Sequence, residues 1–88
     1  MKNLDYKFEN LRYLLGNLGI DILISIGKGA YDFQTIEIIS GVPIECIRGR
    51  IPVLLDLQLI EHSLKGYTLT EKGLLFKQKI EKKSLNNI

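Results

Sequence analysis

The sequence ISGVPIECIRGRIPVLLDLQLIEHSLKGYTLTEKG, residues 39–73, decides the fold of this chain. It starts with the end of a helix, makes a tight turn at Ser40 and Gly41, and continues into a second helix. A short β-hairpin comes next, and its second strand leads directly into another helix. No two of these elements are separated by enough residues for a long loop. The stretch therefore predicts helix, turn, helix, hairpin and helix in immediate succession.

The second helix of this stretch is predicted at residues 43–57, with Pro43 at its first position, where a missing N–H costs nothing. With Ile47 as the inward reference and a turn of about 100° per residue, the buried side carries Ile51, Leu54 and Gln58. The outward side carries Glu45, Gly49, Pro52 and Asp56, with Arg48 on one shoulder and Cys46 and Val53 on the other. This outward side is therefore the exposed face of the predicted helix.

Two of the outward residues disfavour a helix. Gly49 costs about 1 kcal/mol and Pro52 about 3 kcal/mol relative to alanine, since the proline ring crowds the carbonyl of Arg48 and removes a bond to it. Both lie on the solvent side, where water can bond to the freed carbonyl. One kinked helix is therefore predicted, rather than two separate helices.

The hairpin is predicted at residues 59–69, with strands at 59–63 and 66–69 and a turn at Leu64, Lys65 and Gly66. Thr70 is a suitable N-cap for the helix that follows, which is predicted at residues 71–84.

Three more helices are predicted before the deciding stretch. Apolar residues recur every three or four positions over residues 4–15, which favours an amphipathic helix ended by Gly16. Residues 18–27 are apolar around most of a helix, which favours a buried helix, although the β-branched run ILISI leaves a buried strand as the alternative. Asp32 is a good N-cap for a helix at 33–40 with Ile36 and Ile39 facing inward, and Tyr31 is predicted to pair with the hairpin.

The composition limits the class of protein. The chain has 88 residues, 45% of them hydrophobic and 25% charged, which fits one folded domain over residues 1–88. No apolar run approaches the ~20 residues of a membrane span, and the N-terminal MKNLDYKFEN lacks the apolar core of a signal peptide. With its single cysteine, Cys46, the sequence predicts a reducing, cytoplasmic location and no membrane partner.

Charge is distributed unevenly, although the formal net charge is only +2. Acidic residues outnumber basic ones over residues 17–63, whereas lysines dominate from residue 64 onward. The C-terminal end is therefore the basic pole, which either solvates a helix or lies near phosphate.

Three side chains have alternative interpretations. Arg48 contacts a nucleic acid, or forms a surface ion pair with Glu45 or Asp56. His62, the only histidine, is an exposed strand residue or a phosphate contact. Cys46 is a small, partly buried filler or a redox sensor, and no second cysteine is present to resolve an oxidised thiol.

Three motifs carry a resemblance to a known class of protein: SGVP at the turn, LQLIE entering the hairpin, and GYTLTEKG leaving it. Over about residues 18–76, the chain resembles the winged-helix transcription regulators of the MarR and ArsR kind, and the small winged-helix proteins of archaea and their viruses. The resemblance implies a mainly α fold with a small β-hairpin (α+β), a winged helix-turn-helix with extra N-terminal and C-terminal helices.

The resemblance also implies a function and a set of site residues. Such proteins insert the second helix of the motif into the major groove and lay the hairpin along the backbone or minor groove. By position, the residues near base edges are Ile44, Glu45, Arg48 and Gly49, and those near phosphates are Gln34, Arg50, His62 and Lys65. The expected function is sequence-specific binding of double-stranded DNA by a transcription regulator.

We also expect a homodimer, because the terminal helices are too apolar for a chain of this size to bury alone. The residues expected at its interface are Leu4, Phe8, Leu11, Leu15, Phe76 and Ile80. An enzyme is not expected, since there is no phosphate-binding glycine loop and no zinc or triad spacing, and neither cofactor nor metal is predicted. The alternative function is a winged helix used for protein interaction or dimerisation, which the acidic outward face favours.

Overall fold

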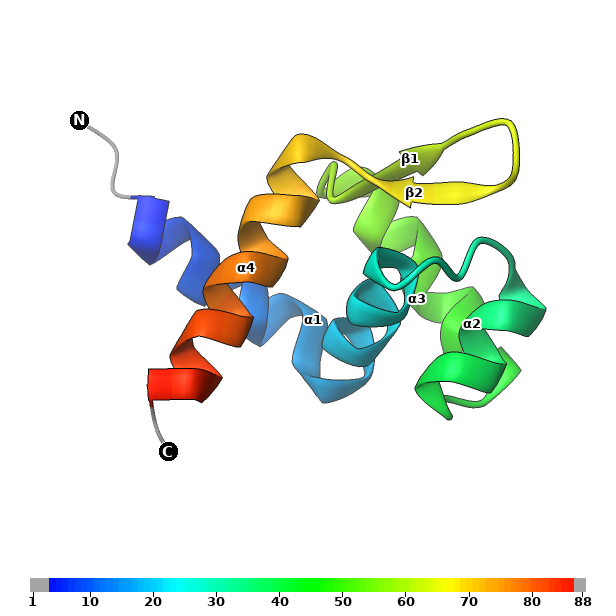
Figure 1. Ribbon diagram of the computed structural model, residues 1–88, viewed down its shortest axis with the longest axis horizontal. Helices are drawn as coiled ribbons and strands as arrows, with labels where there is room; N and C mark the ends of the chain where they lie inside the picture. Colours follow the sequence, from blue (N-terminus) through cyan, green and yellow to red (C-terminus); the bar gives the residue numbers. More distant parts are fainter. Residues whose placement is uncertain (1–3, 87–88) are drawn as a thin grey trace.

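Four helices and a two-stranded antiparallel hairpin make up the part of the chain that the computed structural model describes, residues 4–86, with side chains described over 9–82 (Figure 1). In chain order they are α1 (Leu4–Gly27), α2 (Phe33–Ser40), α3 (Ile44–Asp56), β1 (Ile60–His62), β2 (Tyr67–Leu69) and α4 (Glu71–Asn86). The predicted class, mainly α with a small β-hairpin, is confirmed.

Helix α1 is the element around which the others pack. Its two halves meet at Gly16, whose φ of 67° and ψ of −178° are not helical. The predicted end of the first helix at this glycine is therefore confirmed. The second half is helix rather than strand, and it buries Ile22, Leu23 and Ile26 against its neighbours. It contacts α2, α3, α4 and β2, so a segment apolar on most of its surface lies in the middle of the fold.

Helix α2 begins and ends as its sequence predicts. The Asp32 carboxylate accepts from the Thr35 N–H at 2.8 Å while the Thr35 hydroxyl oxygen accepts from the Asp32 N–H at 3.1 Å, which is a reciprocal capping box. At the other end Gly41 has a φ of 76°, and its N–H donates to the Glu37 carbonyl. Ile36 is fully buried, but the inward placement of Ile39 was wrong: it is 46% exposed, because it lies about 60° round the helix and in the last turn.

Helix α3 runs without interruption through Pro52, which confirms one helix rather than two, while its kink stays a prediction. Pro43 is the N-cap and not the first helical residue, since its ψ of 149° is extended. Ile47, Ile51 and Leu54 are buried as predicted. The buried placement of Gln58 was wrong: α3 ends before it, and Gln58 is an exposed residue with a φ of 61°.

The hairpin pairs Ile60 with Leu69 and His62 with Tyr67, across a turn closed by Ser63 and Gly66. The predicted contact of Tyr31 is confirmed, since the Tyr67 N–H donates to the Tyr31 carbonyl at 2.8 Å.

The start of α4 is tied to the end of α3. Thr70 caps α4, accepting from the Gly73 N–H at 3.0 Å, and its hydroxyl donates to the Gln58 carbonyl at 2.6 Å. The Lys72 ammonium donates to the Leu57 carbonyl at 2.9 Å. A Cβ on Gly73 would overlap the Leu59 carbonyl oxygen, so α4 approaches the chain as closely as only glycine allows. The fold therefore explains Thr70 and Gly73 of the GYTLTEKG motif.

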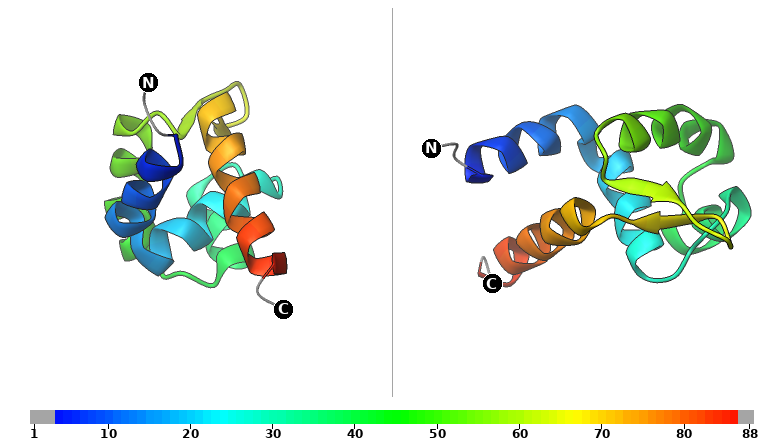
Figure 2. Two further views of the ribbon diagram at one scale, coloured as in Figure 1. Left: turned by 90° about the vertical axis from the view of Figure 1, so that its left-hand side faces the viewer. Right: turned by 90° about the horizontal axis from the view of Figure 1, so that it is seen from above.

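The first half of α1 and the end of α4 lie at one end of the molecule, opposite α2 and the tip of the hairpin (Figure 2). Leu11 and Leu15 of α1 and Phe76 and Ile80 of α4 belong to the core of this single chain. Over the described residues, no helix is both long and apolar enough to cross a membrane.

Candidate nucleic-acid interface

The outward face of α3 is the exposed surface that the sequence predicts. Its exposed residues are Glu45, Arg48, Gly49, Pro52 and Asp56. A Cβ added to Gly49 would meet no atom within 4 Å, so packing within the chain does not require a glycine there. The centre of this face therefore carries little side-chain bulk, with a carboxylate toward each end.

Arg48 lies over an aromatic ring rather than beside a carboxylate. Its guanidinium carbon is 6.0 Å from the centroid of the Phe33 ring, within the range of a cation–π contact. Among the described side chains it forms no ion pair with Glu45 or Asp56. The ion-pair alternative for Arg48 is therefore not the arrangement found, and the side chain is exposed.

The Phe33 ring continues into a row of rings that crosses to the hairpin. Phe33 stacks on Tyr67 with centroids 6.2 Å apart and planes at 21°, and Tyr67 faces His62 at 5.1 Å and 40°. We call Phe33, Tyr67 and His62 the aromatic row. Its members come from α2, β2 and β1, and Arg48 of α3 stands at one end. The row connects α3 to the hairpin along one surface.

The hairpin is held against the loop before α2 by its backbone as well. The Tyr67 N–H bonds to the Tyr31 carbonyl, and a Cβ on Gly66 would overlap that same carbonyl oxygen. Gly66 has a φ of 148°, which also favours glycine. The position of the hairpin relative to α2 and α3 is therefore set by close backbone contact and not by side chains alone.

The structure brings together only part of the predicted site. Gln34 in the first turn of α2, and His62 and Lys65 on the hairpin, are exposed, and Ile44 at the start of α3 is half-buried. Arg50 is separated from this group. Residues two apart on a helix differ by about 200°, so Arg50 points away from Arg48 and lines a shallow hollow beside Leu18 of α1.

Cys46 is a half-buried free thiol that packs against the core and lines the same hollow as Arg50. The filler interpretation explains its position. Within the described residues, no group of three or more histidine, cysteine, aspartate or glutamate side chains is arranged to hold a metal ion.

Most of the residues expected at a dimer interface are buried in the core of the single chain. Four of them are 0–8% exposed and belong to the core of the single chain: Leu11, Leu15, Phe76 and Ile80. Their apolar character is therefore accounted for without a second subunit. The side chains of Leu4 and Phe8 lie outside the described part of the chain. Apolar periodicity shows which side of each helix is apolar, but not that the other elements of the same chain bury that side.

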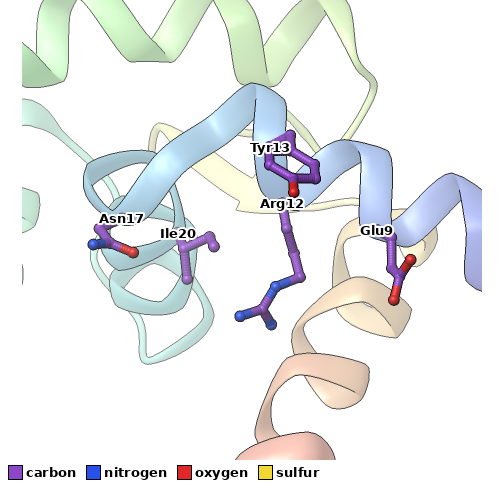
Figure 3. A pocket seen from close by; sticks show the side chains of 5 residues that line it. All are labelled: Glu9, Arg12, Tyr13, Asn17 and Ile20. Atoms are coloured by element: carbon purple, nitrogen blue, oxygen red, sulfur yellow. The ribbon is translucent and has the colours of Figure 1, made fainter.

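A hollow of about 350 Å³ lies beside the bend of α1 (Figure 3). Its lining side chains come from both halves of that helix: Glu9, Arg12, Tyr13, Asn17 and Ile20. Tyr13 is 90% exposed and the neighbouring Leu14 is 58% exposed. Among the described side chains of the first half of α1, residues 9–15, these two are the exposed large apolar ones, whereas Leu11 and Leu15 are buried. In the sequence, Tyr13 and Leu14 lie beside the apolar stripe of the predicted helix, and this position indicates that they are exposed.

Two lysines of α4, Lys72 and Lys77, have partners in the fold. Lys72 bonds to the end of α3, and Lys77 forms an ion pair with Glu81 at 3.0 Å, one turn further along. These contacts favour a structural and solvating role for the basic pole over a dedicated phosphate patch.

Comparisons with protein-family models, with curated proteins and with solved structures give no match to this chain.

Proposed function

We propose that the protein binds double-stranded DNA through α3 and the hairpin, as a cytoplasmic transcription regulator of the winged helix-turn-helix kind. The observation that carries the proposal is the exposed guanidinium of Arg48, which stands at the end of the aromatic row that leads to the hairpin. A helix and a hairpin on one surface, with a planar cation between them, suit a groove and its adjacent backbone.

The proposed contacts divide into two kinds. Arg48 pairs with guanine in the major groove, where a guanidinium bonds O6 and N7 together, and Ile44, Glu45 and Gly49 lie near base edges. Lys65 at the hairpin turn, with His62 and Gln34, contacts phosphate. Arg50 is left out, because it lies on the far side of α3 from Arg48.

Removing Arg48 and removing Lys65 should affect DNA binding differently. Arg48→Ala should cost about 1 to 3 kcal/mol on a selected site and relax discrimination at one base pair. Lys65→Ala should weaken selected and random duplexes alike and lower the slope of log affinity against log salt by about one. Lys82→Ala, an exposed lysine near the end of α4, is the matched control and should change neither.

The assay is a gel-shift titration of random duplex DNA, followed by selection of the best-bound sequences and titration of each variant at several salt concentrations. The slope for the unaltered protein should itself be modest, equal to a few phosphates per subunit, because the chain is only mildly basic. No binding even at low salt would refute the proposal.

The proposed regulator acts as a homodimer. The exposed Tyr13 and Leu14 lie on the first half of α1, in the turn just before its bend at Gly16. A twofold axis there would set two copies of α3 about one DNA turn, ~34 Å, apart. Leu14→Glu should shift sedimentation toward monomer at tens of micromolar, whereas Ile38→Glu, at an exposed apolar residue of α2, should not. A monomer for the unaltered protein would refute the dimer alone.

A second candidate function is protein interaction through α2 and α3. The observation that favours it is the acidic outward face of α3 beside the exposed isoleucines of α2, Ile38 and Ile39, which are 73% and 46% exposed. This candidate takes the place of the first if no duplex binds at low salt.

A further inference from the structure

We propose that Phe33 is a positioning residue that sets base discrimination by holding the Arg48 guanidinium flat and directed outward, without touching DNA itself. This inference rests on the proposed DNA-binding function. It follows from the order of groups along the surface, with the Arg48 guanidinium carbon over the Phe33 ring and Phe33 stacked on Tyr67.

The first step is the chemistry of the contact. A guanidinium carries its N–H donors in its own plane, so stacking on a ring face leaves those donors free for bonds at the edge. An ion pair with Glu45 or Asp56 would use the same donors. The contact with Phe33 therefore holds Arg48 in place and leaves it able to pair with two acceptors at once.

The second step is the rigidity of the support. Phe33 is the first residue of α2, directly after Asp32, whose capping box with Thr35 fixes the start of that helix. On its other side it meets Tyr67, whose N–H is bonded to the Tyr31 carbonyl. The ring is held by a helix start and by the hairpin together.

The third step is the consequence for binding. An arginine side chain that is free in solution loses rotamer freedom when it pairs with a base, and this loss reduces its affinity. A side chain already stacked has lost part of that freedom, so the contact with the base is stronger. This gain in affinity exists only where Arg48 makes a directional contact with a base. It is therefore expected on the selected sequence and not on random DNA.

The test compares variants of the full chain on two probes, a duplex selected from a random pool by the unaltered protein and a scrambled duplex of equal length. Phe33→Leu, which keeps an apolar side chain and removes the ring face, should weaken binding to the selected duplex about two- to fivefold and leave the scrambled duplex unchanged. Phe33→Tyr keeps the ring and should bind as the unaltered protein does. Leu75→Ala, at an exposed apolar residue in the second turn of α4, is the control and should have no effect on either probe.

The decisive comparison is made in the Arg48→Ala background, where Phe33→Leu should have no further effect on either duplex. Equal losses with and without Arg48 would overturn the inference, as would equal losses on both duplexes. If Phe33→Leu does not fold, the NMR spectrum of the unaltered protein gives an independent test, because Arg48 side-chain protons without ring-current shifts would overturn the inference.

A measurement without DNA separates this inference from the proposed function. The side-chain protons of Arg48 should show ring-current shifts in NMR spectra of the free protein, and Phe33→Leu should remove them. Shifts present in a protein that binds no duplex would refute the function and leave the contact intact. Absence of the shifts in a protein that binds DNA would refute the inference alone.

Discussion

Alanine at two glycines, Gly49 in α3 and Gly73 in α4, should change stability in opposite directions. An added Cβ at Gly49 meets no atom within 4 Å, whereas at Gly73 it overlaps the carbonyl oxygen of Leu59. Alanine is favoured over glycine inside a helix by about 1 kcal/mol. Gly49→Ala should therefore raise the free energy of unfolding by about 1 kcal/mol, and the melting temperature by about 4 to 8 °C for a domain of this size.

The cost at Gly73 comes from the contacts that hold α4 close to the end of α3. To accept a methyl group, α4 must move away from Leu59, which weakens the bond from the Thr70 N–H to the Leu59 carbonyl at 3.1 Å and the bond from the Thr70 hydroxyl to the Gln58 carbonyl at 2.6 Å. Each bond contributes about 1 kcal/mol, and overpacking adds roughly 1 to 3 kcal/mol. Gly73→Ala should therefore lower the free energy of unfolding by about 3 kcal/mol.

The assay is equilibrium unfolding in urea followed by far-ultraviolet circular dichroism, with the same denaturant slope required of all three proteins. A neutral Gly73→Ala would refute the close approach of α4 to Leu59. A destabilising Gly49→Ala would mean that the outward face of α3 is covered. If Gly49 also lies against base edges, then the stabilised Gly49→Ala should bind the selected duplex more weakly.

Three further substitutions test local features of the fold. Gln58→Gly should raise the free energy of unfolding by roughly 1 kcal/mol, because glycine adopts the φ of 61° without the strain that a side chain adds; an unchanged or lower value in urea would contradict this. Pro52→Ala should stabilise by about 2 kcal/mol, since it restores the bond to the Arg48 carbonyl on an exposed face, and a fall in melting temperature would show that the ring packs against something. Bonds from the Thr35 N–H and hydroxyl hold the pKa of Asp32 below its ordinary value of 3.8, so the stability it contributes is fully present above the unfolded pKa and is lost as pH falls through the lower folded pKa. Melting curves of Asp32→Asn and the unaltered protein should therefore converge as the pH falls below 3.8 and through the lower folded pKa of Asp32, and a constant difference would contradict the capping role.

The sequence by itself determined the elements and their order, because the signals for them are local. The hydrogen bonds that cap the helices at Asp32, Gly41 and Thr70 join residues that are at most four positions apart. A short stretch of chain therefore contains both partners. The break at Gly16 and the burial of Ile47 and Ile51 follow from backbone preference and helical periodicity in the same way.

The errors came from helix ends and from burial. Gln58 was placed inward by extending the period of α3 beyond Asp56, and Ile39 by treating the last turn of α2 like its middle. Leu11 and Phe76 were predicted at a dimer interface but are buried within the single chain, because periodicity shows which side of a helix is apolar but not which neighbour covers it.

The tertiary structure alone decided which side chains form the candidate interface. Phe33, Arg48 and Tyr67 are far apart in the sequence, and no spacing indicates that a ring of α2 would lie between an arginine of α3 and a tyrosine of β2. Their meeting depends on the angle at which α2 and α3 pack on α1, and on the backbone contact that sets the hairpin against Tyr31. Such contacts are long-range, so they are defined only when the core has packed.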